Sequence, residues 1–196
     1  EVVENNVLEA VKTNILGTTN VVEAALDAGV GKAILLSTDK ACEPLNAYGI
    51  SKAMAEKIFI HANAYSGADG TRFSVTRYGN IWNSNGSVLP TWRRLVREGA
   101  RSVPVTSPLC TRFFMTFTQA VDLVADTAAN MKGGELVIPT LPAYQLGDLV
   151  DAMDVGMDVI GLRPGEKLHE SLDVGVTSDK AARMAVSELR GALAHV

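Results

Sequence analysis

The stretch from Leu35 to Lys52, LLSTDKACEPLNAYGISK, is the most informative part of this chain. It begins in the apolar run Ala33–Leu36, which is typical of a short, buried strand. It ends with Tyr48 and Lys52, which share one face of a helix if the chain is helical from there onward. A strand, a polar loop and a helix in this order are the parts of a βαβ unit.

The Tyr48 and Lys52 pair also indicates chemistry. A lysine ammonium close to a tyrosine favours the phenolate, so we expect the tyrosine pKa to fall below its usual value of about 10. A tyrosine of this kind can act as a base near neutral pH. A hydroxyl at the strand end, on Ser37 or Thr38, would then hold the substrate oxygen. The other interpretation is an ordinary exposed helix pair, worth a few tenths of a kcal/mol.

Hydrophobic patterns predict alternating helices and strands along the chain. The predicted helices are Leu8–Ala28, Asn46–Tyr65, Val88–Gly99, Thr116–Met131, Leu146–Met153 and Ser178–Leu193. The predicted strands are Lys32–Ser37 and Arg72–Tyr78, with shorter ones inside Gly134–Pro139 and Val155–Leu162. Helices that alternate with strands in this order indicate βαβ units and a parallel sheet.

Composition excludes several classes of protein. The chain has 196 residues, of which 47% are hydrophobic and 20% charged, with a net charge of −4. It has no basic cluster typical of nucleic-acid binding and no apolar run long enough to span a membrane. Its two cysteines and three scattered histidines have no metal-ligand spacing. We therefore expect a cytoplasmic protein that binds no metal, no nucleic acid and no membrane.

Four further motifs follow one another along the chain. They are Thr38-Asp39-Lys40, Arg77-Tyr78-Gly79-Asn80, Thr111-Arg112-Phe113 and the octapeptide RPGEKLHE at Arg163–Glu170. Together with the strand, loop and Tyr-x-x-x-Lys segment, they resemble the extended short-chain dehydrogenase/reductase superfamily. Within it, the chain from about Asn6 to about Leu172 is similar to the UDP-N-acetylglucosamine 4,6-dehydratase group of polysaccharide biosynthesis proteins.

The resemblance implies an α/β fold. Residues 1–81 would form the C-terminal part of a Rossmann-like, doubly wound parallel sheet, and residues 82–196 a smaller α/β substrate-binding region. The glycine-rich loop that holds the cofactor pyrophosphate in this superfamily is absent, and the chain begins at Glu1 in what resembles a later crossover helix. The sequence is therefore either a fragment of a longer protein or a chain whose first βαβ half is not represented. The choice between NAD and NADP stays open.

The resemblance also implies a lyase reaction, in which a UDP-hexose loses water through a transient hydride transfer to NADP or NAD. Tyr48, assisted by Lys52, would take the proton of the C4 hydroxyl, with Thr38 beside it. Asp39 would be the acid that protonates the departing C6 hydroxyl, and Lys40 the base that removes the C5 hydrogen. Lysine at this place is the pattern of members that invert C5. A plain Asp-Lys turn is the alternative.

The same resemblance assigns ligand contacts. The expected cofactor contacts are Ser37, Tyr48, Lys52 and Tyr78. The expected substrate contacts are Arg112 and Arg163 for the diphosphate, Ser87 and Val88 for uracil, Glu166 for the ribose, and Asn80 for the sugar or the diphosphate. The segment Asn83–Val88 departs from the family's Gly-Ser-Arg-Gly-Ser-Val, because it has no arginine at Asn85.

Two other functions stay open at this point. A UDP-hexose epimerase would have the same fold and the same Tyr48 and Lys52, but it would not need the Asp39-Lys40 pair. A non-catalytic fragment that keeps only binding or assembly surfaces is the second alternative. We also expect a homo-oligomer, in which the helices Leu8–Ala28 and Asn46–Tyr65 bind a second subunit. The predicted apolar stripe of the first helix is Leu8, Val11, Ile15, Val21, Val22, Ala25 and Leu26.

Overall fold

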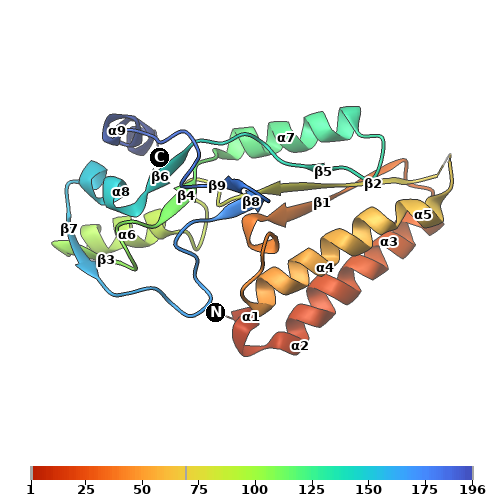
Figure 1. The fold of residues 1–196 in the computed structure, drawn as a ribbon, viewed down its shortest axis with the longest axis horizontal. Coiled ribbons are helices and arrows are strands. Elements are labelled where there is room, and N and C mark those ends of the chain that lie inside the picture. Colours follow the sequence, from red (N-terminus) through yellow and green to blue (C-terminus); the bar gives the residue numbers. More distant parts are fainter. Residues whose placement is uncertain (1, 69, 196) are drawn as a thin grey trace. The chain divides into compact units, whose positions relative to one another are not determined.

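The computed structural model describes residues 2–68 and 70–195 (Figure 1). The chain divides into two compact units. The first unit is Glu1–Tyr78 with Thr118–Pro139, and the second is Gly79–Phe117 with Thr140–Val196. The division at Tyr78 lies close to the boundary expected at residue 81. The sequence did not predict the return of Thr118–Pro139 to the first unit.

The first unit contains a short parallel sheet and the helices that cover it (Figure 1). Its strands are β1 (Lys32–Thr38), β2 (Arg72–Tyr78) and β5 (Leu136–Val137). Its helices are α1 (Val2–Asn5), α2 (Val7–Ala10), α3 (Gly17–Asp27), α4 (Ala47–His61), α5 (Asn63–Ser66) and α7 (Phe117–Asn130). A π-helical segment, Val11–Leu16, joins α2 to α3, so the predicted helix Leu8–Ala28 is nearly continuous.

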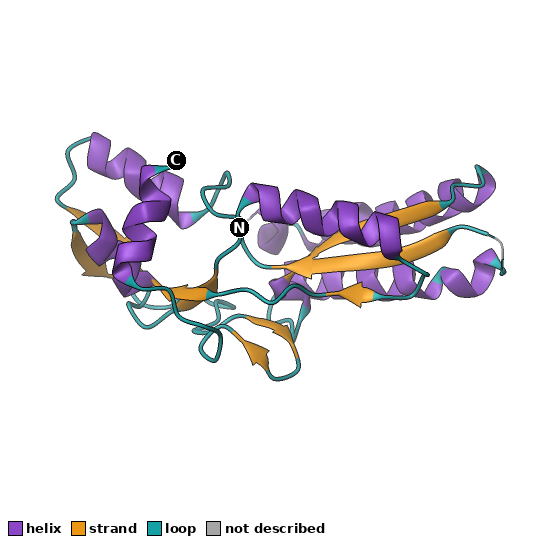
Figure 2. Ribbon diagram, turned by 90° about the horizontal axis from the view of Figure 1, so that it is seen from above, coloured by secondary structure: helices purple, strands orange, loops and turns teal. Residues whose placement is uncertain are grey.

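The sheet has the strand order β1-β2-β5, and both pairings are parallel. Figure 2 shows the strands side by side, and in Figure 1 α3 and α4 lie on one side of the sheet and α7 on the other. The predicted α/β fold with a parallel sheet is confirmed. In the register of β1 with β2, Ser37 pairs with Arg77 and Thr38 with Tyr78. The carboxyl ends of both strands therefore meet at one edge, where ligands bind in open parallel sheets.

The core of the first unit lies between the sheet and the helices α3 and α4. Its buried members are Val22, Ala25, Phe59, Ala62, Phe73 and Val75. Phe59 and Phe73 meet edge to face, with ring centroids 5.1 Å apart. Two residues of the predicted apolar stripe of the first helix are not buried in this core: Leu8 is 75% exposed and Val21 is 56% exposed. The expectation of a buried strand was also wrong for β1, because Leu36 is 48% exposed.

The second unit is built from three helices and three pairs of short strands. The helices are α6 (Val88–Arg97), α8 (Leu146–Met153) and α9 (Val186–Ala194). The pairs are β3 (Ser102–Val105) with β7 (Gly156–Val159), β4 (Thr111–Phe113) with β6 (Ala143–Gln145), and β8 (Ser171–Asp173) with β9 (Val176–Thr177). Its core surrounds Trp92, which is 2% exposed and donates its indole N–H to the Pro104 carbonyl at 3.0 Å.

The predicted helix Ser178–Leu193 was wrong in its first half, because α9 begins only at Val186. The preceding segment uses its backbone groups for tertiary contacts. The Ala143 N–H bonds to the Ala182 carbonyl, and the Met184 N–H bonds to the Ala143 carbonyl. These bonds to β6 replace the intrahelical bonds that the apolar pattern had indicated.

Glu135 joins the turn after α7 to the sheet, and this generates a stability prediction. Its carboxylate accepts hydrogen bonds from the Ser74 hydroxyl at 2.5 Å and from the backbone N–H groups of Lys132 and Gly133. Burial alone would raise the pKa of Glu135, but these hydrogen bonds lower it to about 2.

We expect Glu135→Gln to destabilise the protein by about 1 to 2 kcal/mol near neutral pH, a figure reduced for the partial exposure of the carboxylate. Since the folded pKa is depressed, the contribution of Glu135 is present above its ordinary pKa of 4.5 and is lost as the pH falls through about 2. Urea unfolding of both proteins between pH 7 and about 2 measures this difference. A destabilisation that stays constant over this range would contradict the assignment, and the exposed Glu9→Gln is the control.

Candidate functional site

The end of β1 turns directly into a polar loop. Thr38 caps the 3-10 turn Asp39–Ala41, because its hydroxyl oxygen accepts the Lys40 N–H at 3.3 Å. The same hydroxyl donates to Asp39 Oδ1 at 2.8 Å. Lys40 Nζ donates to this oxygen at 3.0 Å, and Asp39 is only 1% exposed. The predicted acid and base therefore form an ion pair at the carboxyl end of the sheet, and the lysine is the more accessible member.

The first turn of α4 lies against this loop. Asn46 caps the helix through a 2.8 Å hydrogen bond from the Gly49 N–H to its side chain. A Cβ at Gly49 would lie 2.3 Å from the Lys40 carbonyl oxygen, which is too close for any side chain. Gly49 thus allows the helix to approach the Asp39–Lys40 loop, and this approach places the neighbouring Tyr48 beside the ion pair.

Tyr48 is half-buried, and its surroundings differ from the expectation. Burial raises the pKa of the Tyr48 hydroxyl, the positive charge of Lys40 opposes this, and the negative charge of Asp39 adds to it. The net direction is upward from 10.0, so the expected lowering of the pKa was wrong. The cation that favours the phenolate is Lys40 and not Lys52, because Lys52 Nζ donates instead to the Leu36 carbonyl at 2.8 Å.

Lys52 lies on the same face of α4 as Tyr48, as its spacing predicted. Burial lowers the pKa of Lys52, and the negative charge of Glu56 opposes that effect. Tyr78, at the end of β2, pairs with Thr38 in the sheet register, and burial raises its pKa. The structure therefore brings Thr38, Asp39, Lys40, Tyr48, Lys52 and Tyr78 to one region of the first unit.

Ser37 has a buried carboxylate partner that the sequence did not indicate. It is 6% exposed and donates its hydroxyl to Glu56 Oε1 at 2.5 Å. Glu56 is also bound by Arg77. The sequence named Arg77 only as part of a motif and did not indicate Glu56. The available signal was the spacing of Glu56, which continues the face of Tyr48 and Lys52 by one more step of four residues. The contact of Ser37 with a cofactor stays a prediction.

The second unit holds the remaining predicted residues, and two of them are engaged in an internal network. Arg112 is 8% exposed and donates to Glu166 Oε1 at 3.0 Å and to the Thr111 and Leu168 carbonyls. Its Nε lies 3.7 Å from a carboxylate oxygen of Glu170. Two carboxylates therefore balance the charge of Arg112 in this structure, and its proposed contact with a diphosphate stays a prediction.

Glu166 holds the loop that carries the octapeptide. Its carboxylate accepts from the Thr106 hydroxyl at 3.0 Å and from the Arg163 N–H at 3.2 Å, in addition to Arg112. These bonds fix the backbone at Arg163, whose side chain is exposed. Glu166 therefore shapes this loop, and its contact with a ribose stays a prediction.

Three of the predicted substrate contacts lie at or before the start of α6, namely Asn80, Ser87 and Val88. Asn80 is exposed. Ser87 is the N-cap residue of α6, and its hydroxyl is buried without a hydrogen bond to any residue that the structure describes. Val88 packs against the Trp92 core. Ser87 thus has a buried hydroxyl that a ligand could bind.

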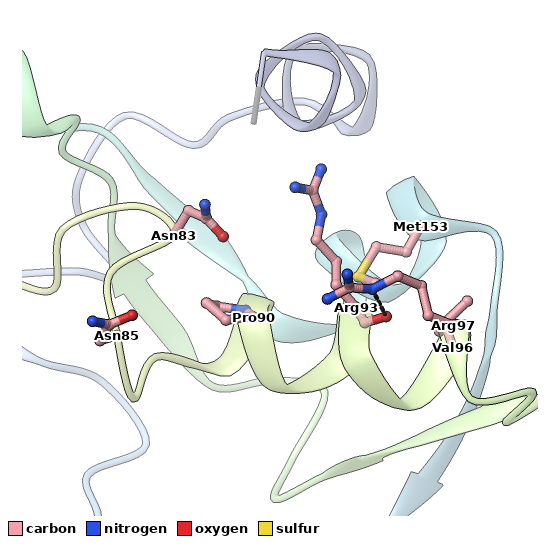
Figure 3. A pocket seen from close by; sticks show the side chains of 7 residues that line it. All are labelled: Asn83, Asn85, Pro90, Arg93, Val96, Arg97 and Met153. Atoms are coloured by element: carbon pink, nitrogen blue, oxygen red, sulfur yellow. Dashed lines mark hydrogen bonds between the residues drawn. The ribbon is translucent and has the colours of Figure 1, made fainter.

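A pocket of about 540 Å³ lies beside α6 in the second unit (Figure 3). It is lined by Asn83, Asn85, Pro90, Arg93, Val96, Arg97 and Met153. Arg93 donates to the Leu193 carbonyl of α9 at 2.5 Å, and Arg97 donates to the Arg93 carbonyl. Its lining includes Asn85, where the family pattern has arginine, but none of the substrate residues predicted from the sequence. We therefore place no chemistry in this pocket.

The described residues contain no group of three or more histidine, cysteine, aspartate or glutamate side chains that could hold a metal ion. Within the same residues, no helix is long and apolar enough to cross a membrane.

The parallel sheet, with helices on both sides and polar side chains at the carboxyl ends of its strands, defines a Rossmann-like α/β protein. The chain belongs to the polysaccharide biosynthesis protein family, whose model matches residues 1–188. It is 44% identical over 171 residues to a UDP-N-acetylglucosamine 4,6-dehydratase (inverting) of Campylobacter jejuni, covering 86% of this chain and 51% of that protein.

Two further comparisons extend this result. A UDP-glucose 4-epimerase of Rickettsia rickettsii is 39% identical over 182 residues, covering 90% of this chain and 52% of that protein. The X-ray structure of Pen from Bacillus thuringiensis superposes with a TM-score of 0.91 at 32% identity, covering 99% of this chain and 71% of that one. The chain spans about half the length of the curated relatives that it matches.

The electrostatics of Tyr48 generate a test. We expect Tyr48 to titrate above 10, and Lys40→Met to raise its pKa further, because Lys40 is the cation that favours the phenolate. NMR of tyrosine labelled with ¹³C at Cζ separates the four tyrosines and follows each one. The exposed Lys57→Met is the control. The assignment fails if Tyr48 titrates below 10, or if Lys52→Met raises its pKa while Lys40→Met does not.

Proposed function

We propose that the whole protein to which this chain belongs is a nucleotide-sugar dehydratase that removes water from UDP-N-acetylglucosamine and gives a 4-keto-6-deoxy sugar. The observation that carries this proposal is the Asp39–Lys40 ion pair, closed at 3.0 Å beside Tyr48 at the carboxyl end of β1. An epimerase needs the Tyr and Lys pair but has no use for this second acid and base. The 44% identity to the Campylobacter jejuni enzyme supports the same activity.

The donors at the edge of the sheet fit a nicotinamide cofactor at its reactive end. Tyr48, Lys52 and Tyr78 offer two hydroxyls and one ammonium, all of them half-buried. When bound, NAD or NADP accepts a hydride from the sugar and returns it, so that it is not consumed. The glycine-rich loop that binds a pyrophosphate is not within these 196 residues, so this chain would hold only part of the cofactor.

Tyr48 is the base for the first step. It takes the proton of the sugar's C4 hydroxyl while Thr38 holds that oxygen. Because burial raises the Tyr48 pKa, the phenolate is a minor form at neutral pH, and Lys40 is the charge that favours it. The rate of this step should therefore rise with pH. Lys52, held at the Leu36 carbonyl, contributes a donor on the same helix face.

The second step uses Asp39 and Lys40 together. Transfer of one proton from the Lys40 ammonium to the Asp39 carboxylate gives a neutral amine and a carboxylic acid without a change in net charge. The amine then removes the C5 hydrogen, which the C4 ketone has made acidic. The acid protonates the C6 hydroxyl as it leaves as water, so that a C5–C6 double bond forms. C6 would then take back the hydride that left C4, and the Lys40 ammonium would return a proton to C5.

The second unit supplies the contacts to the nucleotide. The exposed Arg163 side chain, on the loop fixed by Glu166, is the candidate for the diphosphate, since a guanidinium matches phosphate oxygens in a bidentate manner. Ser87 offers a buried hydroxyl at the start of α6 for the base, with Val88 and Asn80 nearby in the sequence. A nucleotide-linked substrate and a nicotinamide cofactor are both cytoplasmic metabolites, and they favour a cytoplasmic enzyme.

The experiment uses Lys40→Arg in the full-length protein. Arginine keeps the positive charge beside Tyr48 but cannot act as a base, because it stays protonated. We expect oxidation at C4, seen as transient cofactor absorbance, to persist. Deuterium uptake at C5 from D₂O should fall at least about 100-fold, as is typical for loss of a general base. Lys57→Arg on the exposed face of α4 is the control.

An epimerase is the second candidate, because the Rickettsia rickettsii relative carries that name. It would give a product of unchanged mass with no deuterium at C5, and Lys40→Arg would then leave C5 exchange absent in both proteins. This outcome would exclude the dehydratase.

We also propose that a second copy of the chain binds exposed apolar residues of α2, the π-helical segment Val11–Leu16, α3 and α4. They include Leu8, Leu16, Val21, Ile50 and Met54, which are 75%, 51%, 56%, 56% and 48% exposed. The double variant Val21→Glu and Met54→Glu should halve the mass measured by light scattering. Val174→Glu, at a residue 86% exposed in the second unit, should not change it. A monomeric wild-type protein would contradict this proposal.

A further inference from the structure

Three buried polar residues form a cluster directly behind the proposed catalytic residues. Ser37, Glu56 and Arg77 are 6%, 3% and 7% exposed. Glu56 Oε1 accepts from the Ser37 hydroxyl at 2.5 Å and from Arg77 Nε at 2.8 Å, and Glu56 Oε2 pairs with Arg77 Nη2. The cluster thus joins α4 to both β1 and β2.

The chemistry proposed above uses none of these three groups as an acid, base or ligand. A buried ion pair does not in general stabilise a fold more than apolar residues of the same volume, because both charges must be removed from water. Its retention at this edge therefore calls for another role. The position of the cluster in the sheet and on the helix indicates that role.

The cluster lies next to the site residues in the sheet. Ser37 and Arg77 are paired in the sheet, one residue before Thr38 and Tyr78. On α4, Glu56 follows Lys52 by four residues, and Lys52 Nζ is bound to the Leu36 carbonyl, one residue before Ser37. Two neighbouring positions on one face of α4, Lys52 and Glu56, therefore contact two consecutive residues of β1, Leu36 and Ser37. A rotation or a shift of α4 would break them together.

We propose that Glu56, held by Ser37 and Arg77, is a positioning residue that fixes the rotation and depth of α4, so that Tyr48 and Lys52 face the carboxyl end of β1 and β2. The inference rests on the proposed function of Tyr48 and Lys52. Glu56 has a second effect, because its negative charge opposes the lowering of the Lys52 pKa by burial. Arg77 pairs with Glu56, and its positive charge reduces the effect of the Glu56 charge on Lys52.

Ser37→Ala is the first test, because it removes one hydrogen bond and leaves the ion pair in place. The matched control is Ser74→Ala, since Ser74 also donates to a glutamate at 2.5 Å, lies on β2 in the same unit and is remote from the site residues in the strand register. In the full-length protein, we expect Ser37→Ala to lower kcat by about tenfold with little change in KM, because a small misplacement of catalytic groups acts on the chemical step. Ser74→Ala should leave kcat unchanged.

Glu56→Gln is the second test, with a readout that does not depend on turnover. NMR of lysine labelled with ¹⁵N at Nζ follows the titration of Lys52, whose pKa should move further down when the Glu56 charge is removed. In Ser37→Ala, where the Glu56 charge remains, this titration should move less.

Two results would overturn the proposal. One is an equal loss of kcat in Ser37→Ala and Ser74→Ala, which would indicate a general loss of stability. The other is a Lys52 titration that Glu56→Gln leaves unchanged. If the wild-type protein turns over no UDP-sugar, the proposed function fails, and the Lys52 titration still decides the inference.

Discussion

The register of β1 against β2 is the constraint on which the rest of the site depends. It pairs Ser37 with Arg77 and Thr38 with Tyr78, so that two strand ends separated by forty residues of chain stop at the same edge. A slip by one residue would turn each of these side chains to the opposite face of the sheet. The helix α4 is then placed against this edge by the close approach at Gly49 and by the bonds of Glu56.

Charge balance is the second theme of the structure. Three buried charges each have an opposite partner close by: Asp39 has Lys40, Glu56 has Arg77, and Arg112 has Glu166. These ion pairs differ in how far their side chains are exposed to solvent. The Glu56 and Arg112 pairs are enclosed and hold segments together, whereas Lys40 is 32% exposed at its side chain and can reach a substrate. This difference in exposure separates the pair proposed for proton transfer from the pairs that shape the scaffold.

The sequence predicted the main helices and strands of the first unit, because the spacing of apolar residues within one helix or strand depends only on neighbouring residues. The strand Arg72–Tyr78 and the shared face of Tyr48 and Lys52 were found in this way. The late start of α9 and the return of α7 and β5 to the first sheet depend on contacts between distant segments, which periodicity does not carry. The carboxylate partners of Ser37 and Arg112 were missed for the same reason, since these partners lie 19 and 54 residues away along the chain.

The dehydratase proposal depends above all on the Asp39–Lys40 pair, which would remove water from a UDP-sugar beside Tyr48. The decisive measurement is the mass of the product after the full-length protein is incubated with UDP-N-acetylglucosamine and NADP or NAD. We predict a product lighter than the substrate by one water molecule, with the cofactor unchanged at the end. A product of unchanged mass that differs only in the configuration at C4 would contradict the proposal.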